Sequence, residues 1–122
     1  MKVCLASLAL FFAFVTGTQA QKIDKYCEVV MYTKVFSVEK CNPHIQLGES
    51  DSLFSFKDPS VVASLKKVNK FNTRADVLNY MALLGWTLTG NSAIGNWEQP
   101  TAHYYIFKKS FDLAELNAPK TE

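Results

Sequence analysis

The chain has 122 residues, of which 48% are hydrophobic and 20% are charged, and its formal net charge at pH 7 is +2. This length fits one folded domain, and the near balance of charges argues against a nucleic-acid-binding protein, which needs a concentrated basic surface. The densest group of cations is flanked by Asp58 and Asp76 and is interpreted as solvated surface; it consists of Lys66, Lys67, Lys70 and Arg74.

The first twenty residues have the three-part pattern of a secretory signal peptide. A positive Met1-Lys2 start precedes the apolar run Val3 to Val15, and small residues lead to a predicted cleavage after Ala20. The apolar run is shorter than the roughly 20 residues of a membrane-spanning helix, so we expect no transmembrane span. We therefore predict export to the periplasm or the outside of the cell, with a signal peptide at 1–20, a single domain at 21–112 and a polar C-terminal tail at 113–122.

Strand chemistry begins at Tyr26, where Val, Tyr, Phe and Thr alternate through Val38, and a turn is predicted around Thr33 to Ser37. A hairpin that turns about Lys34 would place Cys27 opposite Cys41, at a spacing that a disulfide accepts. The two cysteines are therefore a candidate disulfide of an exported chain, although a slip of one residue in register would separate them.

Residues 53–70 allow two interpretations. Asp58 followed by Pro59 is typical of a helix start, and a short helix would be lined on one side by Val61, Val62, Leu65 and Val68. The same stretch could instead be an irregular loop that ends in a strand at Lys67 to Phe71.

A helix is predicted from Thr73 to Leu84. Thr73 and Asp76 form a capping pattern, and Gly85 supplies the left-handed residue that ends such a helix. Its apolar stripe is expected to contain Ala75, Leu78, Met81 and Ala82, flanked by Val77 and Leu84. A short strand at Trp86 to Thr89, a turn-rich connection at Gly90 to Pro100 and a final strand at Ala102 to Lys109 are predicted to follow.

Two runs carry a resemblance, Lys70 to Leu88 (KFNTRADVLNYMALLGWTL) and His103 to Lys109 (HYYIFKK), together with Tyr26-Cys27-Glu28. They resemble small exported proteins of Bacteroides-type bacteria and, more distantly, a widespread bacterial domain family of unknown function. The resemblance implies the fold and the export and assigns no functional residue. It also implies an extended segment just before Phe71, which favours the strand interpretation of the unclear region.

The candidate fold is α+β, a small antiparallel sheet of about four strands with one helix packed on one face, in ββαββ order. No cofactor site, metal site or catalytic group is predicted from residue spacing. Trp97 in the connection either caps the core or is an exposed binding contact, and His103 is included in the possible binding surface.

The leading functional hypothesis is a small exported binding or interaction protein without catalysis, whose partner would be a protein or a small ligand. The alternative is a small secreted hydrolase that uses His103 or His44 as its base. A deep pocket with a histidine bonded to serine, cysteine or carboxylate would favour the hydrolase, and a shallow aromatic patch would favour binding. A third possibility is a subunit that oligomerises through an uncovered sheet edge.

Overall fold

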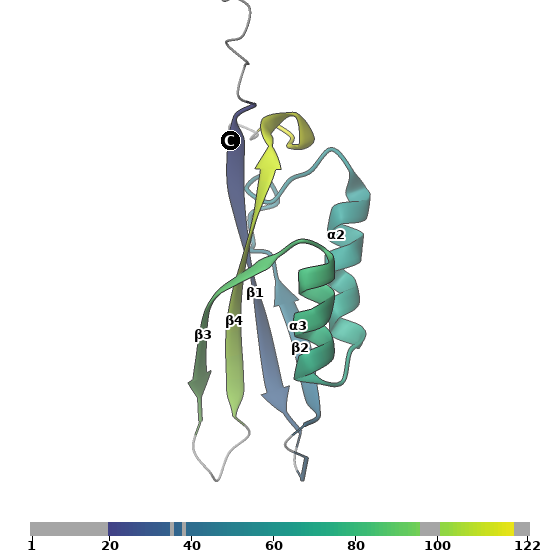
Figure 1. Cartoon of the computed structure of the whole chain (residues 1–122), viewed down its shortest axis with the longest axis vertical. Helices are drawn as coiled ribbons and strands as arrows, with labels where there is room; N and C mark the ends of the chain where they lie inside the picture. Colours follow the sequence, from purple (N-terminus) through teal and green to yellow (C-terminus); the bar gives the residue numbers. More distant parts are fainter. Residues whose placement is uncertain (1–19, 35, 38, 96–100, 119–122) are drawn as a thin grey trace, which may run out of the picture.

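A four-stranded antiparallel sheet with helices at one side forms the body of the protein, as seen in the computed structural model (Figure 1). The structure describes residues 20–34, 36–37, 39–95 and 101–118. Its elements in chain order are β1 (Lys22–Thr33), β2 (Cys41–Gln46), α2 (Pro59–Lys66), the 3-10 helix η2 (Lys67–Lys70), α3 (Arg74–Leu83), β3 (Thr87–Ile94), β4 (Ala102–Asp112) and the 3-10 helix η3 (Leu113–Glu115). The α+β class with four antiparallel strands is confirmed, whereas two helices instead of one separate the two strand pairs.

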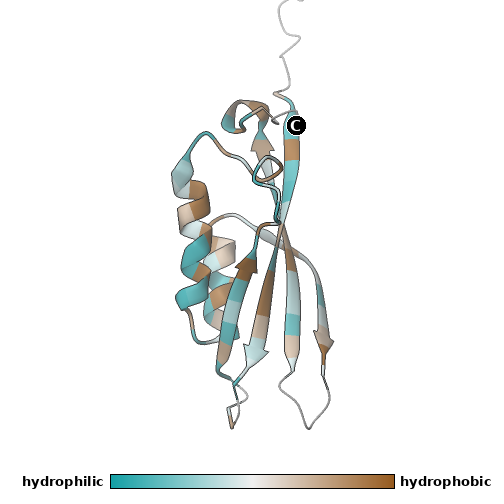
Figure 2. Cartoon of the chain, turned by 180° about the vertical axis from the view of Figure 1, so that it is seen from behind, coloured by the Kyte–Doolittle hydropathy of each residue, from teal (hydrophilic) through white to brown (hydrophobic). Residues whose placement is uncertain are grey.

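The sheet order is β2-β1-β4-β3, so the two long strands β1 and β4 lie at the centre. Side chains alternate between the two faces, and hydrophobic and hydrophilic bands follow each other along the strands (Figure 2). The helix-facing side holds Cys27, Val29 and Met31 of β1 opposite Phe107, Tyr105 and His103 of β4. The core continues from there into the helices through Leu65, Val68, Val77, Met81, Trp86 and Phe111.

Helix α3 begins where the capping pattern predicts. The hydroxyl oxygen of Thr73 accepts a hydrogen bond from the Asp76 N–H at 3.2 Å and donates one to the Asp76 carboxylate at 2.7 Å. The buried residues are Val77 and Met81, one turn apart, whereas Ala75 and Ala82 are exposed. The burial of Met81 agrees with the predicted stripe, whereas Val77, predicted on its flank, is also buried, and Ala75 and Ala82, predicted within it, are exposed.

The end of α3 has the double hydrogen bond of a Schellman motif. The Trp86 N–H donates to the Met81 carbonyl at 3.0 Å, and the Gly85 N–H donates to the Ala82 carbonyl at 2.9 Å. Gly85 has a φ of +83°, the left-handed value that the prediction required. This motif confirms the predicted helix end and turns Trp86 into the core.

The strand predicted at Lys67 to Phe71 is wrong, because the helical alternative for this region is the one that forms. Asp58 caps α2 by accepting from the Ser60 N–H at 2.9 Å, and η2 continues the chain to Lys70. Leu65 and Val68 are both buried. Residues three apart share one face of a helix but lie on opposite faces of a strand, which accounts for the helical outcome.

The β1–β2 hairpin turns later than predicted. Thr33 pairs with Cys41 and Glu28 pairs with Gln46, so the turn is centred near residue 37 rather than at Lys34. Strand β3 is also longer than predicted, because residues 90–94 of the expected connection pair with β4 up to Ile94 opposite Ala102. The polar composition of this stretch does not predict a strand, but hydrogen bonding to β4 stabilises one.

Residues 113–117, predicted as the start of a polar tail with Leu113 and Leu116 as candidate surface contacts, pack on the domain. Leu116 is buried and forms a β-bridge with Phe56. The side-chain amide of Asn117 donates to the Phe56 carbonyl at 3.0 Å and to the Ser55 hydroxyl at 2.9 Å. The chain end thereby covers the aromatic cluster of Phe54, Phe56, Trp86 and Phe111.

Candidate functional site

The two histidines of the hydrolase alternative lie on opposite faces of the sheet. His103 pairs with Met31 on the helix-facing side, whereas exposed His44 pairs with Val30 on the outer side and touches the Tyr32 ring edge at 6.0 Å between centroids. The structure therefore does not bring His44 and His103 into one site.

His103 is paired with a cation. Its Nε2 lies 3.4 Å from the guanidinium of Arg74, and its ring is tilted on Tyr105. Burial and, secondly, the Arg74 charge lower the pKa of His103 below its ordinary value. Among the described residues no serine, cysteine or carboxylate is hydrogen bonded to this imidazole, so the described part of the chain lacks the arrangement that would favour the hydrolase.

The outer face of the sheet has an aromatic centre, here called the tyrosine face and made up of Tyr26, Val30, Tyr32, Tyr104 and Ile106. Tyr26 and Tyr32 are exposed, yet Val30 between them on the strand is only 1% exposed, although it lies on the face opposite the described helices. Its cross-strand neighbours on β2 and β4, His44 and Tyr104, flank it on both sides. The two exposed tyrosines and the half-buried Tyr104 make this face an aromatic patch.

The candidate disulfide is wrong. Cys27 and Cys41 are both free and buried on the helix-facing side. In the observed register Cys41 pairs with Thr33. Thr33 lies six residues along β1 from Cys27, so the rise of a strand separates Cys27 from the residue opposite Cys41 by about 20 Å. A disulfide needs Cα atoms within about 7 Å, so the late hairpin turn keeps the thiols apart.

Neither described thiol has the properties of a reactive cysteine. Burial raises the pKa of Cys27 to about 12, and burial also raises the pKa of Cys41 despite the nearby charges of Arg74 and Lys34. The thiolate is the nucleophile in thiol chemistry, so both cysteines act as small core residues. Trp97, the other predicted contact residue, lies outside the described residues.

Several depressions mark the described surface, and they include the following three. One of about 480 Å³ is lined by Glu39, Thr73, Arg74, Ala75, Leu78 and Tyr105. A second of about 580 Å³ is largely apolar and is lined by Ile23, Lys25, Ser52, Leu53, Lys57, Leu113, Leu116, Asn117 and Ala118. The third, here called the α2 cleft, has a volume of about 390 Å³ and is lined by Ile45, Leu47, Gly48, Ser50, Asp51, Phe54, Val62, Lys66 and Asn69.

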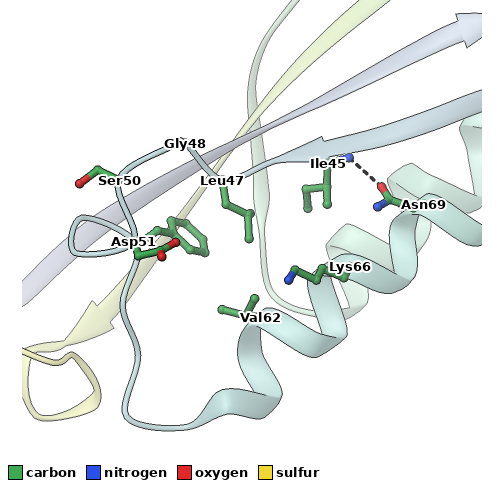
Figure 3. A pocket seen from close by; sticks show the side chains of 9 residues that line it. Ile45, Leu47, Gly48, Ser50, Asp51, Val62, Lys66 and Asn69 are labelled. Carbon is green, nitrogen blue, oxygen red and sulfur yellow. Dashed lines mark hydrogen bonds between the residues drawn. The ribbon is translucent and has the colours of Figure 1, made fainter.

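The α2 cleft opens between the end of β2, the loop of residues 47–54 and helix α2 (Figure 3). Its floor is apolar, because Ile45, Leu47 and Val62 turn toward one another across it. Figure 3 also shows the carboxylate of Asp51 and the ammonium of Lys66 on opposite sides of this floor. Among the described residues neither group takes part in an ion pair, so both charges are available to a ligand.

The walls of the α2 cleft are held in place. Phe54 stacks on Trp86 with ring centroids 6.2 Å apart, which anchors the loop in the aromatic cluster. Lys25 Nζ donates to the Leu53 carbonyl at 2.6 Å and ties the same loop to β1. On the other wall, Asn69 Oδ1 accepts from the Ile45 N–H at 2.8 Å. The cleft is therefore largely preformed, which lowers the entropic cost of binding.

Sequence reasoning missed this site. On sequence alone Lys66 is interpreted as part of a solvated surface, and no function is predicted for the polar residues before Phe54. The only sequence indication is the Leu53-Phe54-Ser55-Phe56 run, in which two aromatic residues follow directly on a polar loop. Such a pattern indicates that a loop is anchored in the core, but it does not indicate that α2 lies opposite the loop.

Comparison with protein-family models, with curated proteins and with solved structures finds no match to this chain. The resemblance to exported Bacteroides-type proteins therefore stays a prediction. In the described part of the chain, no helix has the length and apolar character needed to cross a membrane.

Proposed function

We propose that this chain is a small exported, non-catalytic binding protein and that the α2 cleft holds its ligand. The observation that carries the proposal is the pair of opposite, unpaired charges, Asp51 and Lys66, across one apolar floor. Ligand sites are commonly concave and apolar, with a few polar groups that fix the orientation of the ligand. The volume of about 390 Å³ lies within the usual range for such sites.

The chemistry of the cleft selects a zwitterion with apolar side chains, such as a short apolar peptide with free termini. The ligand ammonium would meet the Asp51 carboxylate, and the ligand carboxylate would meet the Lys66 ammonium, each through a charge-assisted hydrogen bond. The apolar side chains would cover the floor around Leu47. A singly charged ligand would leave one of the two protein charges without a partner.

The expected affinity is modest, because the cleft is open to solvent. Leucyl-leucine has about 17 non-hydrogen atoms, and at about 0.3 kcal/mol per atom its binding free energy is about 5 kcal/mol, a Kd of roughly 0.2 mM.

Titration with leucyl-leucine tests the proposal. The Trp97→Phe variant leaves Trp86 as the single tryptophan of the chain, and Trp86 reports on the cleft because Phe54 stacks on it. We expect Lys66→Gln to weaken binding about tenfold through the lost charge-assisted bond. The matched control is Lys67→Gln, whose side chain does not line the cleft and which should bind like the parent.

The other end of the ligand is tested in the same way. Asp51→Asn should weaken binding about tenfold, and its control is Glu49→Gln in the same loop. N-acetylated leucyl-leucine should lose the Asp51 contribution, and leucyl-leucine amide should lose the Lys66 contribution. Equal binding of the free and blocked peptides, or equal losses in Lys66→Gln and Lys67→Gln, would contradict the assigned site.

Export is tested by intact mass spectrometry of the native protein. The expected chain begins at Gln21, because cleavage after Ala20 removes the leader. Two thiols should take up iodoacetamide only after unfolding, since burial keeps Cys27 and Cys41 protonated and covered. A native chain that retains Met1 would refute export, and a mass lower by two hydrogens would indicate a disulfide and refute the observed register.

A further inference from the structure

One edge of the sheet, formed by β2, offers no free backbone donor at its outward-facing positions. The outward-facing backbone positions of β2 are residues 41, 43 and 45. The Cys41 N–H donates to the Asn72 carbonyl at 2.7 Å, Pro43 has no N–H, and the Ile45 N–H donates to the Asn69 side chain at 2.8 Å. No outward N–H of these three positions is left for another strand. Natural sheets close their edges in this way because an open edge pairs with other chains.

The opposite edge is open. Strand β3 pairs with β4 on one side only, and in the described part of the chain no segment hydrogen bonds to its other side. Seven of its eight residues are exposed. Its sequence, TLTGNSAI, contains none of the lysine or proline residues that commonly protect an edge strand. Two of its exposed side chains are large and apolar, Leu88 at 42% and Ile94 at 64% exposure.

We propose that β3 pairs antiparallel with β3 of a second copy about a two-fold axis, so that two four-stranded sheets join into one sheet of eight strands. The absence of charge on β3 favours a second copy, because two identical uncharged strands meet without like-charge repulsion. An uncharged strand also offers no charge by which to select a different partner.

The position of β3 fits this arrangement. It is the strand farthest from α2 and α3 (Figure 1), so the helices of a second copy do not obstruct the pairing. The regular part of β3 is residues 90–94, beyond the β-bulge between Leu88 and Gly90. With the two-fold axis at Ser92, these five residues pair with their copies and span about 17 Å of strand. A two-fold axis perpendicular to the sheet places both tyrosine faces on the same side, where they form one extended surface. The inference stands independently of the α2 cleft, which lies beyond β2 at the other edge of the sheet.

Sedimentation velocity of the processed protein tests the pairing. We expect a monomer at about 1 μM and a reversible dimer at about 500 μM, because strand pairing alone makes a small interface. Amides within residues 90–94 should exchange more slowly with solvent as the protein concentration rises. A protein that stays monomeric at the highest concentration would overturn the proposal. The proposal would also be overturned if β3 paired with an extended peptide and not with a second copy.

Charge variants identify the interface. Ser92→Lys places two lysines close together across the two-fold axis and should weaken dimerisation at least about tenfold. The matched control Gln46→Lys adds the same charge to the same face of β2 at the closed edge, and should leave the dimer unchanged. A mixture of Ser92→Lys with Ser92→Glu should dimerise again, which also shows that both variants fold. Dimerisation unaffected by Ser92→Lys, or no recovery in the mixture, would place the interface elsewhere.

Discussion

Replacing Phe107 with alanine is expected to reduce the free energy of unfolding by about 3–5 kcal/mol, the usual cost of deleting a buried aromatic ring. Phe107 is 2% exposed and lies at the middle of β4, opposite Cys27 of β1. Its ring fills the space between the sheet and the helices, where the fixed backbone of two central strands prevents the cavity from closing. For a domain of this size the melting temperature should fall by roughly 15–30 °C.

The neighbouring residue supplies the control. Ile106 points to the outer face and is 41% exposed, so Ile106→Ala should cost less than about 1 kcal/mol. Urea unfolding followed by circular dichroism measures both variants. Similar losses for Phe107→Ala and Ile106→Ala would mean that the register of β4 is shifted by one residue or that the outer face is as buried as the core.

The elements that the sequence predicts correctly are those specified by local chemistry. Helix α3 follows from Thr73, Asp76 and Gly85, because capping groups and a left-handed glycine act on their own backbone neighbours. The alternation along β1 likewise follows from the residues themselves. These features depend little on the rest of the chain.

The errors concern features that distant residues decide. Strand β3 extends to Ile94 because β4 offers it hydrogen-bond partners, whereas its own composition indicates a turn. The hairpin turn lies three residues later than predicted, and this shift alone removes the candidate disulfide. Register is set by cross-strand packing, which a single strand sequence does not contain.

The α2 cleft shows the same limit for function. Ile45, Asp51 and Lys66 come from β2, a loop and α2. The packing of Phe54 on Trp86 and the hydrogen bond from Lys25 to the Leu53 carbonyl hold the loop opposite the helix. The spacing of these residues in the sequence does not indicate that they lie close together in the fold. A lysine in a binding site and a lysine on a solvated surface look the same in the sequence. They differ only in which residues face them in the folded protein.

Replacing Ala63 with proline is expected to reduce the free energy of unfolding by about 3 kcal/mol or more. Ala63 lies inside α2 and its side chain is exposed, so the change removes no core contact. Proline at this position lacks the N–H of a helical hydrogen bond, and its ring collides with the carbonyl of residue 59. The matched control Ala63→Gly should cost only about 1 kcal/mol through backbone entropy.

This pair of variants separates the two interpretations of residues 53–70, because an irregular loop would tolerate proline about as well as glycine. Urea unfolding gives the two free energies, and far-ultraviolet circular dichroism shows whether helix content falls. Ala63→Pro should also abolish leucyl-leucine binding, since Val62 and Lys66 reach the cleft only when α2 is formed. A proline cost equal to the glycine cost would contradict α2, and with it the wall on which the proposed site depends.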